Sequence, residues 1–179
     1  MTIYEEGLSA NNANYTPLTP VDFLERAAET WPNKTTIIHG TTRRTYQEFL
    51  ERSKQMASAI NKRKIGEGDV VSIIAPNTPA MLESHYGVIM SGAVLNALNY
   101  RLDAPTIAFI LEHGESKLVM VDKEFSSVME EAFALMKKVP EVIGIDDELA
   151  PEGKLLGEID YETFLMEGDP DYRWPRVKD

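Results

Sequence analysis

The sequence predicts an α/β fold, in which a mainly parallel β-sheet is flanked by helices and a small β-hairpin lies near the N-terminus. Near-continuous apolar runs, typical of strands buried on both faces of a parallel sheet, alternate with segments in which apolar residues recur at helical spacing. Cap residues, prolines and glycines mark the ends of these segments. The alternation of strands and helices favours a layered sheet with right-handed crossovers.

The first part of the chain is predicted to hold a helix and then the hairpin. The helix covers Pro20–Thr30, because the hydroxyl of Thr19 can cap it and proline suits its first turn. The hairpin has a β-prone segment at Thr35–Ile38 and a turn at His39–Thr42, where Gly40 can adopt a positive φ.

A longer helix follows the hairpin. It starts at a capping box formed by Thr45 and Glu48 and is predicted to end at Gly66. Its spacing predicts one buried face, formed by Phe49, Leu50, Ser53, Met56, Ala57 and Ile60.

Four apolar runs are predicted to form the parallel sheet, at Val70–Ala75, Ala93–Leu98, Leu118–Val121 and Glu141–Ile145. Helices are expected between and after them, at Pro79–Ser91, Asp103–His113, Ser126–Lys138 and Tyr161–Glu167. The first of these helices is predicted to turn four side chains towards the core: Met81, Leu82, Tyr86 and Ile89.

Composition narrows the classes of function. The chain of 179 residues contains no cysteine, which excludes disulfides, thiolate metal sites and cysteine nucleophiles. Its net charge of −11 argues against nonspecific binding to nucleic acid, because the phosphates would be repelled. The N-terminus resembles no secretory leader, and no apolar run reaches the length of a membrane span. We therefore expect a cytoplasmic protein without nucleic-acid or membrane partners.

Motifs that carry their own chemistry are few. The sequence has no G-x-x-x-x-G-K-[ST], G-x-G-x-x-G, H-E-x-x-H or G-x-S-x-G pattern. His39, His85 and His113 lack a second ligand at metal spacing, so each is expected to form a local hydrogen bond. The stretch His39–Arg44 fits a plain turn better than a phosphate site, and the acidic run Asp146–Glu148 fits a solvated loop better than a Mg²⁺ site.

Four blocks of sequence carry a resemblance to a known family. They are TYQEF (Thr45–Phe49), GEGDVVSIIAPN (Gly66–Asn77), ESHYGVIMSGAVLNALNYRL (Glu83–Leu102) and LVMVD (Leu118–Asp122). Their order and spacing resemble the opening blocks of the adenylate-forming acyl-CoA synthetases, and in particular the short- to medium-chain and methylthio-propionate ligases. The resemblance implies that residues 1–179 are the N-terminal subdomain of such a ligase, with an extended segment at 1–18 and a loop-rich exit segment at 147–179.

The small-residue stretch within the third block has a structural interpretation. Small side chains at Ser91–Ala93 let a helix end turn closely into a strand, and Asn96 and Asn99 can hydrogen-bond the loop backbone that follows. The sequence departs from the family pattern at Ser91, where alanine is usual, and at Ala97, where proline is common. These departures affect only the assignment to a subfamily.

The family uses ATP, Mg²⁺ and CoA to adenylate a carboxylic (fatty) acid and to transfer the acyl group to CoA. Its Thr/Ser/Gly-rich phosphate loop, later nucleotide motifs and mobile C-terminal domain with a catalytic lysine have no counterpart in this sequence. The resemblance therefore implies an N-terminal scaffold that has no catalytic residue, binds none of these cofactors alone and needs the remainder of the ligase, in the same or another chain, as its partner. Association with a second copy is left open.

Arg101 is the one candidate binding residue. In the family the arginine of the N-x-R-L element lies on the face that meets CoA, so the resemblance implies a contact with a CoA phosphate, which a guanidinium binds bidentately. The alternative is a helix-entry arginine paired with Asp103 or Glu112. Two other functions also stay open for the chain: a free-standing α/β binding or regulatory module with its ligand at the carboxyl ends of the strands, or an interaction domain for a separate chain.

Overall fold

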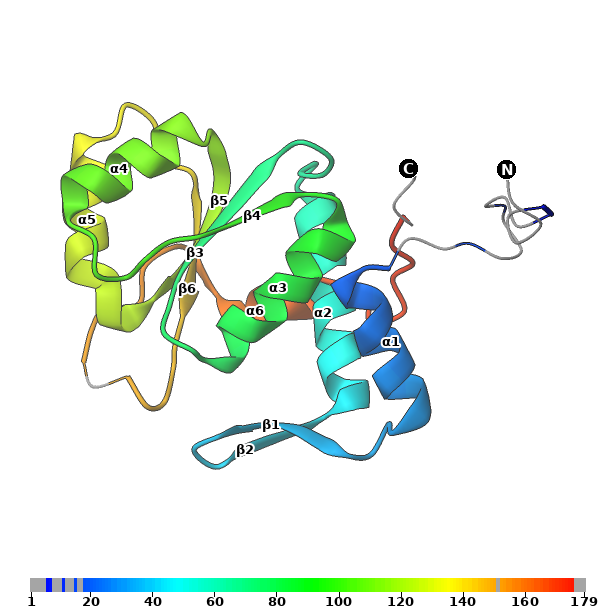
Figure 1. The fold of residues 1–179 in the computed structure, drawn as a ribbon. Coiled ribbons are helices and arrows are strands. Elements are labelled where there is room, and N and C mark those ends of the chain that lie inside the picture. Colours follow the sequence, from blue (N-terminus) through cyan, green and yellow to red (C-terminus); the bar gives the residue numbers. More distant parts are fainter. Residues whose placement is uncertain (1–5, 8–10, 12–14, 16–17, 151, 176–179) are drawn as a thin grey trace.

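The computed structural model describes residues 6–7, 11, 15, 18–150 and 152–175. The extended segment expected at 1–18 lies almost entirely outside these residues. The described chain forms a parallel sheet with helices on both faces, and a further layer built from an N-terminal helix and a two-stranded hairpin (Figure 1).

The parallel sheet has the strand order β4-β3-β5-β6-β7, and every neighbouring pair in it is parallel. The strands are β3 (Val70–Ile74), β4 (Val94–Ala97), β5 (Ser116–Asp122), β6 (Glu141–Ile145) and β7 (Ile159–Asp160). The four strands predicted from apolar runs and their parallel direction are confirmed. β7 was not predicted, because a two-residue strand leaves no periodicity to detect.

Helices cover the two faces of the sheet. One face packs against α2 (Tyr46–Lys62), α3 (Pro79–Ser91) and α6 (Tyr161–Met166), and the other against α4 (Ala104–His113) and α5 (Ser126–Leu135). A short 3-10 turn, Lys123–Phe125, leads from β5 into α5. Successive side chains of β5 alternate between the faces, since Leu118 and Met120 join the first core and Val119 and Val121 the second.

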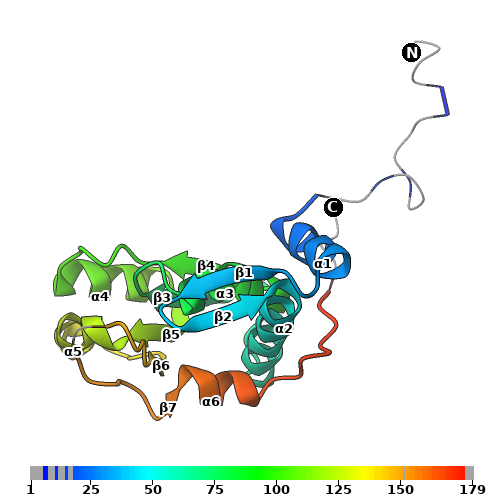
Figure 2. The same cartoon turned by 90° about the horizontal axis from the view of Figure 1, so that it is seen from below.

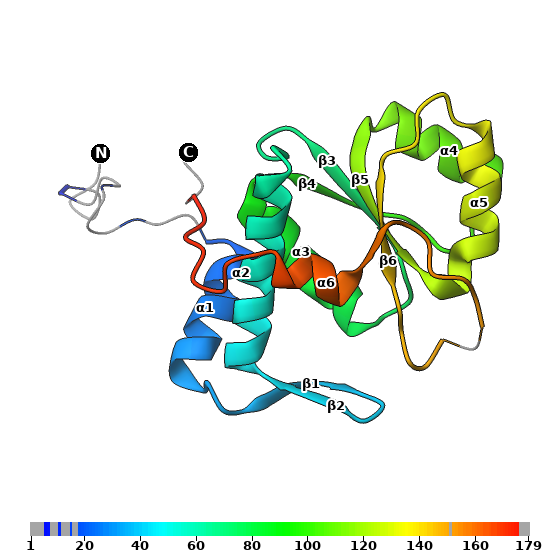
Figure 3. The ribbon, with the colours of Figure 1, turned by 180° about the vertical axis from the view of Figure 1, so that it is seen from behind.

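A third layer lies outside α2. It contains α1 (Pro20–Thr30) and the antiparallel hairpin of β1 (Thr35–His39) and β2 (Thr42–Thr45). Val21, Leu24, Ile37, Phe49 and Trp174 form its apolar core. The hairpin extends from α2 past the end of α3 (Figure 2), while α6 lies between α2 and β6 on the opposite side (Figure 3).

The predicted helix starts are confirmed. Thr19 and Thr45 each cap a helix through a complete capping box, with Asp22 and Glu48 as the reciprocal carboxylates. Asp103 caps α4 by accepting a hydrogen bond from the Thr106 backbone N–H. Each cap satisfies backbone donors that have no partner inside the helix.

Two predicted helix ends are wrong. α2 ends at Lys62 rather than Gly66, because Lys64 adopts a positive φ of 59° and turns the chain towards β3. α5 ends at Leu135 rather than Lys138. The backbone N–H of Lys137 is taken by the Glu112 carboxylate, and Pro140 follows soon after, so the helix cannot continue.

The predicted orientation of α3 is confirmed for Met81 and Tyr86, which pack against the cores, and is wrong for Leu82 and Ile89. Leu82 and Ile89 are 40% and 37% exposed, whereas the buried face carries smaller or polar residues, namely Ala80, Glu83, Ser84, Gly87 and Val88. A Cβ on Gly87 would lie 2.7 Å from the Met56 Cβ, so the small face lets α3 and α2 pack closely. Leu82 and Ile89 consequently face outwards.

A buried carboxylate joins the layers. Glu83 of α3 is fully buried, and its oxygens accept hydrogen bonds from Arg44 of β2 at 2.7 Å, from Arg52 of α2 at 2.7 and 3.2 Å, and from the Tyr161 hydroxyl of α6 at 2.6 Å. Arg52 also forms two 2.7 Å hydrogen bonds with Glu162. Four elements therefore meet at one charge.

The protonation states of this cluster follow from its burial and charges. Burial would lower the pKa of Arg52, but its hydrogen bonds to Glu162 and the nearby charge of Glu83 outweigh burial and raise that pKa overall. Burial, with the charge of Glu83 beside it, raises the pKa of Tyr161 well above its ordinary value. Tyr161 is thus a neutral phenol that donates its proton to Glu83.

We expect the Glu83→Gln variant to lower the free energy of unfolding by about 3 kcal/mol, because removing one partner of a buried ion pair leaves the other charge uncompensated. The matched control is Glu162→Gln, since Glu162 pairs with the same Arg52 but its side chain is 58% exposed. That change should cost less than about 1 kcal/mol. Urea unfolding at pH 7, followed by circular dichroism, measures both, and equal losses would contradict the assignment.

Candidate functional site

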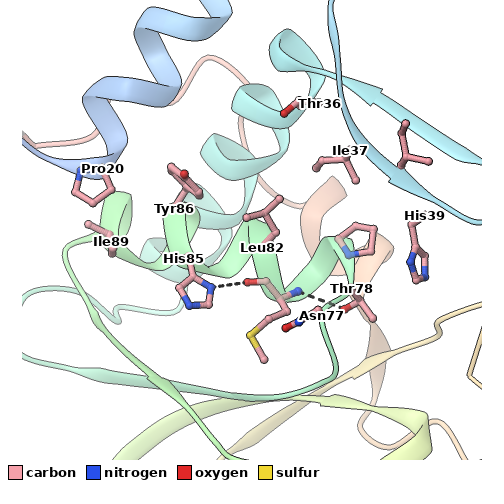
Figure 4. Close-up of a pocket in the computed structure, with 13 residues that line it drawn as sticks. Pro20, Thr36, Ile37, His39, Asn77, Thr78, Leu82, His85, Tyr86 and Ile89 are labelled. Carbon is pink, nitrogen blue, oxygen red and sulfur yellow. Dashed lines mark hydrogen bonds between the residues drawn. The ribbon is translucent and has the colours of Figure 1, made fainter.

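An apolar groove lies between α3 and the hairpin. Its volume is about 610 Å³. It is lined by Thr36, Ile37, Ile38 and His39 of β1, by Asn77 and Thr78 before α3, by Pro79, Met81, Leu82, His85, Tyr86 and Ile89 of α3, and by Pro20. Figure 4 shows these side chains converging from the two elements.

Local sequence chemistry positions α3 along the groove. Thr78 caps the helix by accepting a hydrogen bond from the Met81 backbone N–H, and Pro79 occupies the first turn. The helix ends at Gly92, whose φ of 87° is left-handed. This confirms that small residues at Ser91–Ala93 let the helix turn into β4.

A second, smaller cleft of about 260 Å³ adjoins the groove at the carboxyl end of β6. Its polar walls include Arg44, Thr78 and Glu162, together with the acidic loop after β6. His39 lines both cavities and contacts Asp147 of that loop through Nε2 at 2.7 Å. The clefts therefore meet where the tip of the hairpin contacts the sheet edge.

The histidines behave only partly as predicted. His85 makes the expected local contact, with its Nδ1 2.8 Å from the Met81 carbonyl oxygen. His113 stacks on Phe109 instead, with ring centroids 5.3 Å apart. The contact of His39 with Asp147 is long-range, since 108 positions separate the two residues.

The acidic loop after β6 is solvated as predicted at Asp146 and Glu148, whereas Asp147 is partly buried. Asp146 pairs with Lys123 at 2.6 Å, and Asp147, whose side chain is 10% exposed, binds His39 and the Leu149 backbone N–H. In the part of the chain that the structure describes, no three His, Asp or Glu side chains are grouped to hold a metal ion.

Asp122 lies beside this loop at the carboxyl end of β5. It is fully buried, and one of its oxygens accepts a hydrogen bond from the Glu124 backbone N–H at 3.1 Å. Its other oxygen, Oδ2, is the one buried side-chain polar atom of the described residues without a hydrogen-bond partner. Burial, together with the charges of Asp147 and Glu124, raises the pKa of Asp122 to about 6.

Arg101 lies in the exposed loop between β4 and α4. Its guanidinium is 5.8 Å from the ring centroid of Tyr100, and among the described residues it forms no ion pair. The two carboxylates proposed as alternative partners are used elsewhere, because Asp103 caps α4 and Glu112 accepts from the Lys137 backbone. The helix-entry ion pair is therefore wrong.

The two asparagines before Arg101 divide in their roles. Asn99 accepts a hydrogen bond from the Arg101 backbone N–H at 3.0 Å, which confirms the predicted loop contact. Asn96 instead donates to the Ser72 hydroxyl on β3 at 3.0 Å. Because β3 lies beside β4 in the sheet, this polar side chain pairs across strands and does not reach the loop.

Comparison with known proteins decides the family. The sequence profile described as AMP-binding enzyme matches residues 24–171. The chain belongs to this family. The resemblance drawn from the four sequence blocks is thus confirmed.

Similar curated proteins are acyl-CoA ligases. A peroxisomal acetate/butyrate–CoA ligase of Arabidopsis thaliana is 48% identical over 174 residues, covering 90% of this chain and 31% of the ligase. An acetate–CoA ligase of Humulus lupulus is 44% identical over 186 residues, covering 97% of this chain and 33% of that protein. The chain spans about a third of the length of these relatives and corresponds to their N-terminal part.

Solved structures confirm the fold. An anthranilate CoA ligase in complex with anthranoyl-AMP matches 88% of this chain with a TM-score of 0.78 at 19% identity, over 29% of its own length. A benzoate CoA ligase from Burkholderia xenovorans LB400 matches 88% of this chain with a TM-score of 0.74 at 21% identity, over 30% of its length.

The predicted cytoplasmic location is wrong. Several relatives carry a peroxisomal label, among them the Arabidopsis ligases for acetate/butyrate, butyrate and benzoate and a Petunia cinnamate ligase. A peroxisomal targeting signal of the Ser-Lys-Leu type is recognised by a receptor at a C-terminus. The features of an N-terminal sequence therefore do not distinguish a cytoplasmic protein from a peroxisomal one. Within the described residues, no helix is long and apolar enough to cross a membrane.

The described residues do not fit a nucleotide triphosphate. The cationic side chains at and beside the smaller cleft are neutralised, since Arg44 pairs with Glu83 and Lys123 with Asp146. The cleft is also lined by the carboxylates of Asp146, Asp147, Glu148 and Glu162, which repel phosphate. No step of nucleotide chemistry can therefore be assigned to these residues.

The raised pKa of Asp122 predicts a pH-dependent contribution to stability. The folded state binds this proton more tightly than the unfolded chain, whose aspartates titrate near 3.8. The contribution is therefore complete below pH 4 and is lost as the pH rises through 6, by up to about 3 kcal/mol. The Asp122→Asn variant keeps the acceptor for Glu124 and should remove this loss.

Urea unfolding between pH 4.5 and 8 gives the free energy of unfolding of the variant and of the parent chain. The difference between the two values is compared across pH, because the contributions of the other carboxylates then cancel. The variant should gain stability relative to the parent chain as the pH rises through about 6. Asp146→Asn, at an exposed carboxylate, is the control and should show a much smaller trend. If the difference in unfolding free energy between Asp122→Asn and the parent chain stayed constant with pH, the prediction would be contradicted.

Proposed function

We propose that this chain is the N-terminal part of an acyl-CoA ligase, which activates a carboxylic acid with ATP as an acyl adenylate and then passes the acyl group to CoA. The observation that carries the proposal is the 48% identity to an acetate/butyrate–CoA ligase over 90% of the chain. Identity at that level, across nearly all of the fold, favours a shared reaction over a shared scaffold alone.

The substrate class we propose is a small carboxylic acid. Relatives that are 40–48% identical to the chain are named for acetate, butyrate and benzoate. Such acids differ in size and aromaticity, so the choice among them belongs to the acyl pocket. ATP, Mg²⁺ and CoA are the co-substrates and cofactor that this proposal requires.

The role proposed for the chain itself is that of a scaffold. Adenylation requires donors and a metal around the developing phosphoryl charge. Arg44, Arg52 and Lys123 do not supply them, because all three are already paired with carboxylates. We therefore place the groups that bind the ATP phosphates in the two-thirds of the ligase fold that the relatives have in addition.

A fusion protein tests the proposed function. Residues 1–179 replace the matching segment of the Arabidopsis acetate/butyrate ligase, and ATP–pyrophosphate exchange is measured with acetate, butyrate and benzoate. We expect exchange by the fusion and none by the 179-residue chain alone, relative to heat-killed controls. A folded but inactive fusion would favour a free-standing binding module, and exchange by the chain alone would refute the scaffold role.

For Arg101 we propose a contact with a phosphate of CoA. The guanidinium is exposed and lacks a carboxylate partner among the described residues, and its fork of donors suits phosphate oxygens. In the fusion, Arg101→Ala should raise the apparent KM for CoA about tenfold, the effect of losing charged hydrogen bonds, and leave pyrophosphate exchange unchanged.

Arg43→Ala is the matched control, because Arg43 is also an exposed arginine and its guanidinium contacts only hairpin carbonyls. It should change neither measurement. If exchange fell together with CoA use in the Arg101→Ala protein, the arginine would be structural.

A further inference from the structure

The outer face of α3 carries a continuous apolar seam. Leu82, His85, Tyr86 and Ile89 follow the spacing i, i+3, i+4 and i+7, and all four line the groove. Leu82 and Ile89 are 40% and 37% exposed, although both are large aliphatic side chains. Figure 4 shows these side chains along one side of the helix.

The opposite wall of the groove is also apolar and open. Ile38 of β1 is 68% exposed, and Ile37 and Thr36 lie beside it. No aspartate, glutamate, lysine or arginine is among the described residues that line the groove. The side chains that line it and ionise near neutral pH are His39 and His85, and His39 is already held by Asp147, so the groove suits an apolar surface better than a charged ligand.

The shape of the groove argues against a small acid as its occupant. The seam runs along α3 from Leu82 to Ile89, about 10 Å at the usual helical rise. Acetate or butyrate, with two or four carbon atoms, would fill a small part of the 610 Å³. A helix laid into the groove would instead match both its length and the i, i+3, i+4, i+7 spacing.

We propose that this groove receives an apolar helix face from the remaining two-thirds of the ligase. The proposal rests on the proposed function, since the curated relatives are about three times as long as this chain. The large aliphatic side chains Leu82 and Ile89 stand exposed on the groove side of α3, and apolar surface of this kind is usually buried in larger proteins. α2 and the sheet cover the inner side of α3, so the seam is the face left for the remainder.

The absence of cysteine provides a clean test. Ile89→Cys and Leu82→Cys each introduce a single thiol into the 179-residue chain, and Leu135→Cys on α5, at a leucine 59% exposed and outside the groove, is the control. Each variant is made in the chain alone and in the fusion described above. Maleimide labelling rates at the introduced thiol are followed by peptide mass spectrometry, after circular dichroism has confirmed folding.

We expect both groove thiols to label at least tenfold more slowly in the fusion than in the chain alone, with the Leu135→Cys rate unchanged. Equal rates in both proteins would overturn the proposal. Slow labelling in the chain alone that depends on its concentration would also overturn it, because a second copy would then be the occupant.

Pyrophosphate exchange by the same fusion is read independently. Exchange without protection of the groove thiols would defeat the docking proposal and leave the proposed function standing. Protection without exchange would support the docking surface while the proposed function failed.

Discussion

The buried charge of Glu83 is the constraint on which the arrangement of the layers depends. A carboxylate that is fully buried is tolerated only when donors surround it, and Arg44, Arg52 and Tyr161 supply them from three different elements. Those elements lie far apart in the sequence. Their convergence on α3 fixes the hairpin against the helix, and so forms the groove between them and the smaller cleft at the sheet edge.

Much of the fold was predictable because it depends on local chemistry. Parallel strands buried on both faces leave apolar runs, and threonine caps with a carboxylate three residues later mark helix starts, as Thr19 and Thr45 do. The helix ends were predicted less well. α5 stops where the distant Glu112 captures the Lys137 N–H, and no local pattern contains that contact.

The candidate site was harder to predict, because it arises from tertiary contacts. The sequence suggested that the larger residues of α3 face inwards, yet Gly87 and its small neighbours pack against Met56 and leave Leu82 exposed. Asp122 could have been singled out from the sequence, because an aspartate at the end of a buried strand must find hydrogen-bond partners or have a shifted pKa. Glu83 could not, because a lone glutamate in a helix is usually solvated.

The distribution of charge also accounts for the proposed role of this part of the fold as a scaffold that leaves the ATP phosphates to the rest of the ligase. The chain carries a net charge of −11, and the cationic side chains of Arg44 and Lys123 are held by its own carboxylates. Releasing Arg44 towards a phosphate would leave Glu83 buried with one donor fewer, at a cost that a weak additional contact would not offset. Binding of the ATP phosphates therefore requires groups from elsewhere. An uncharged groove suits such a division, because an apolar surface can dock there without competing for any of the ion pairs that hold the scaffold together.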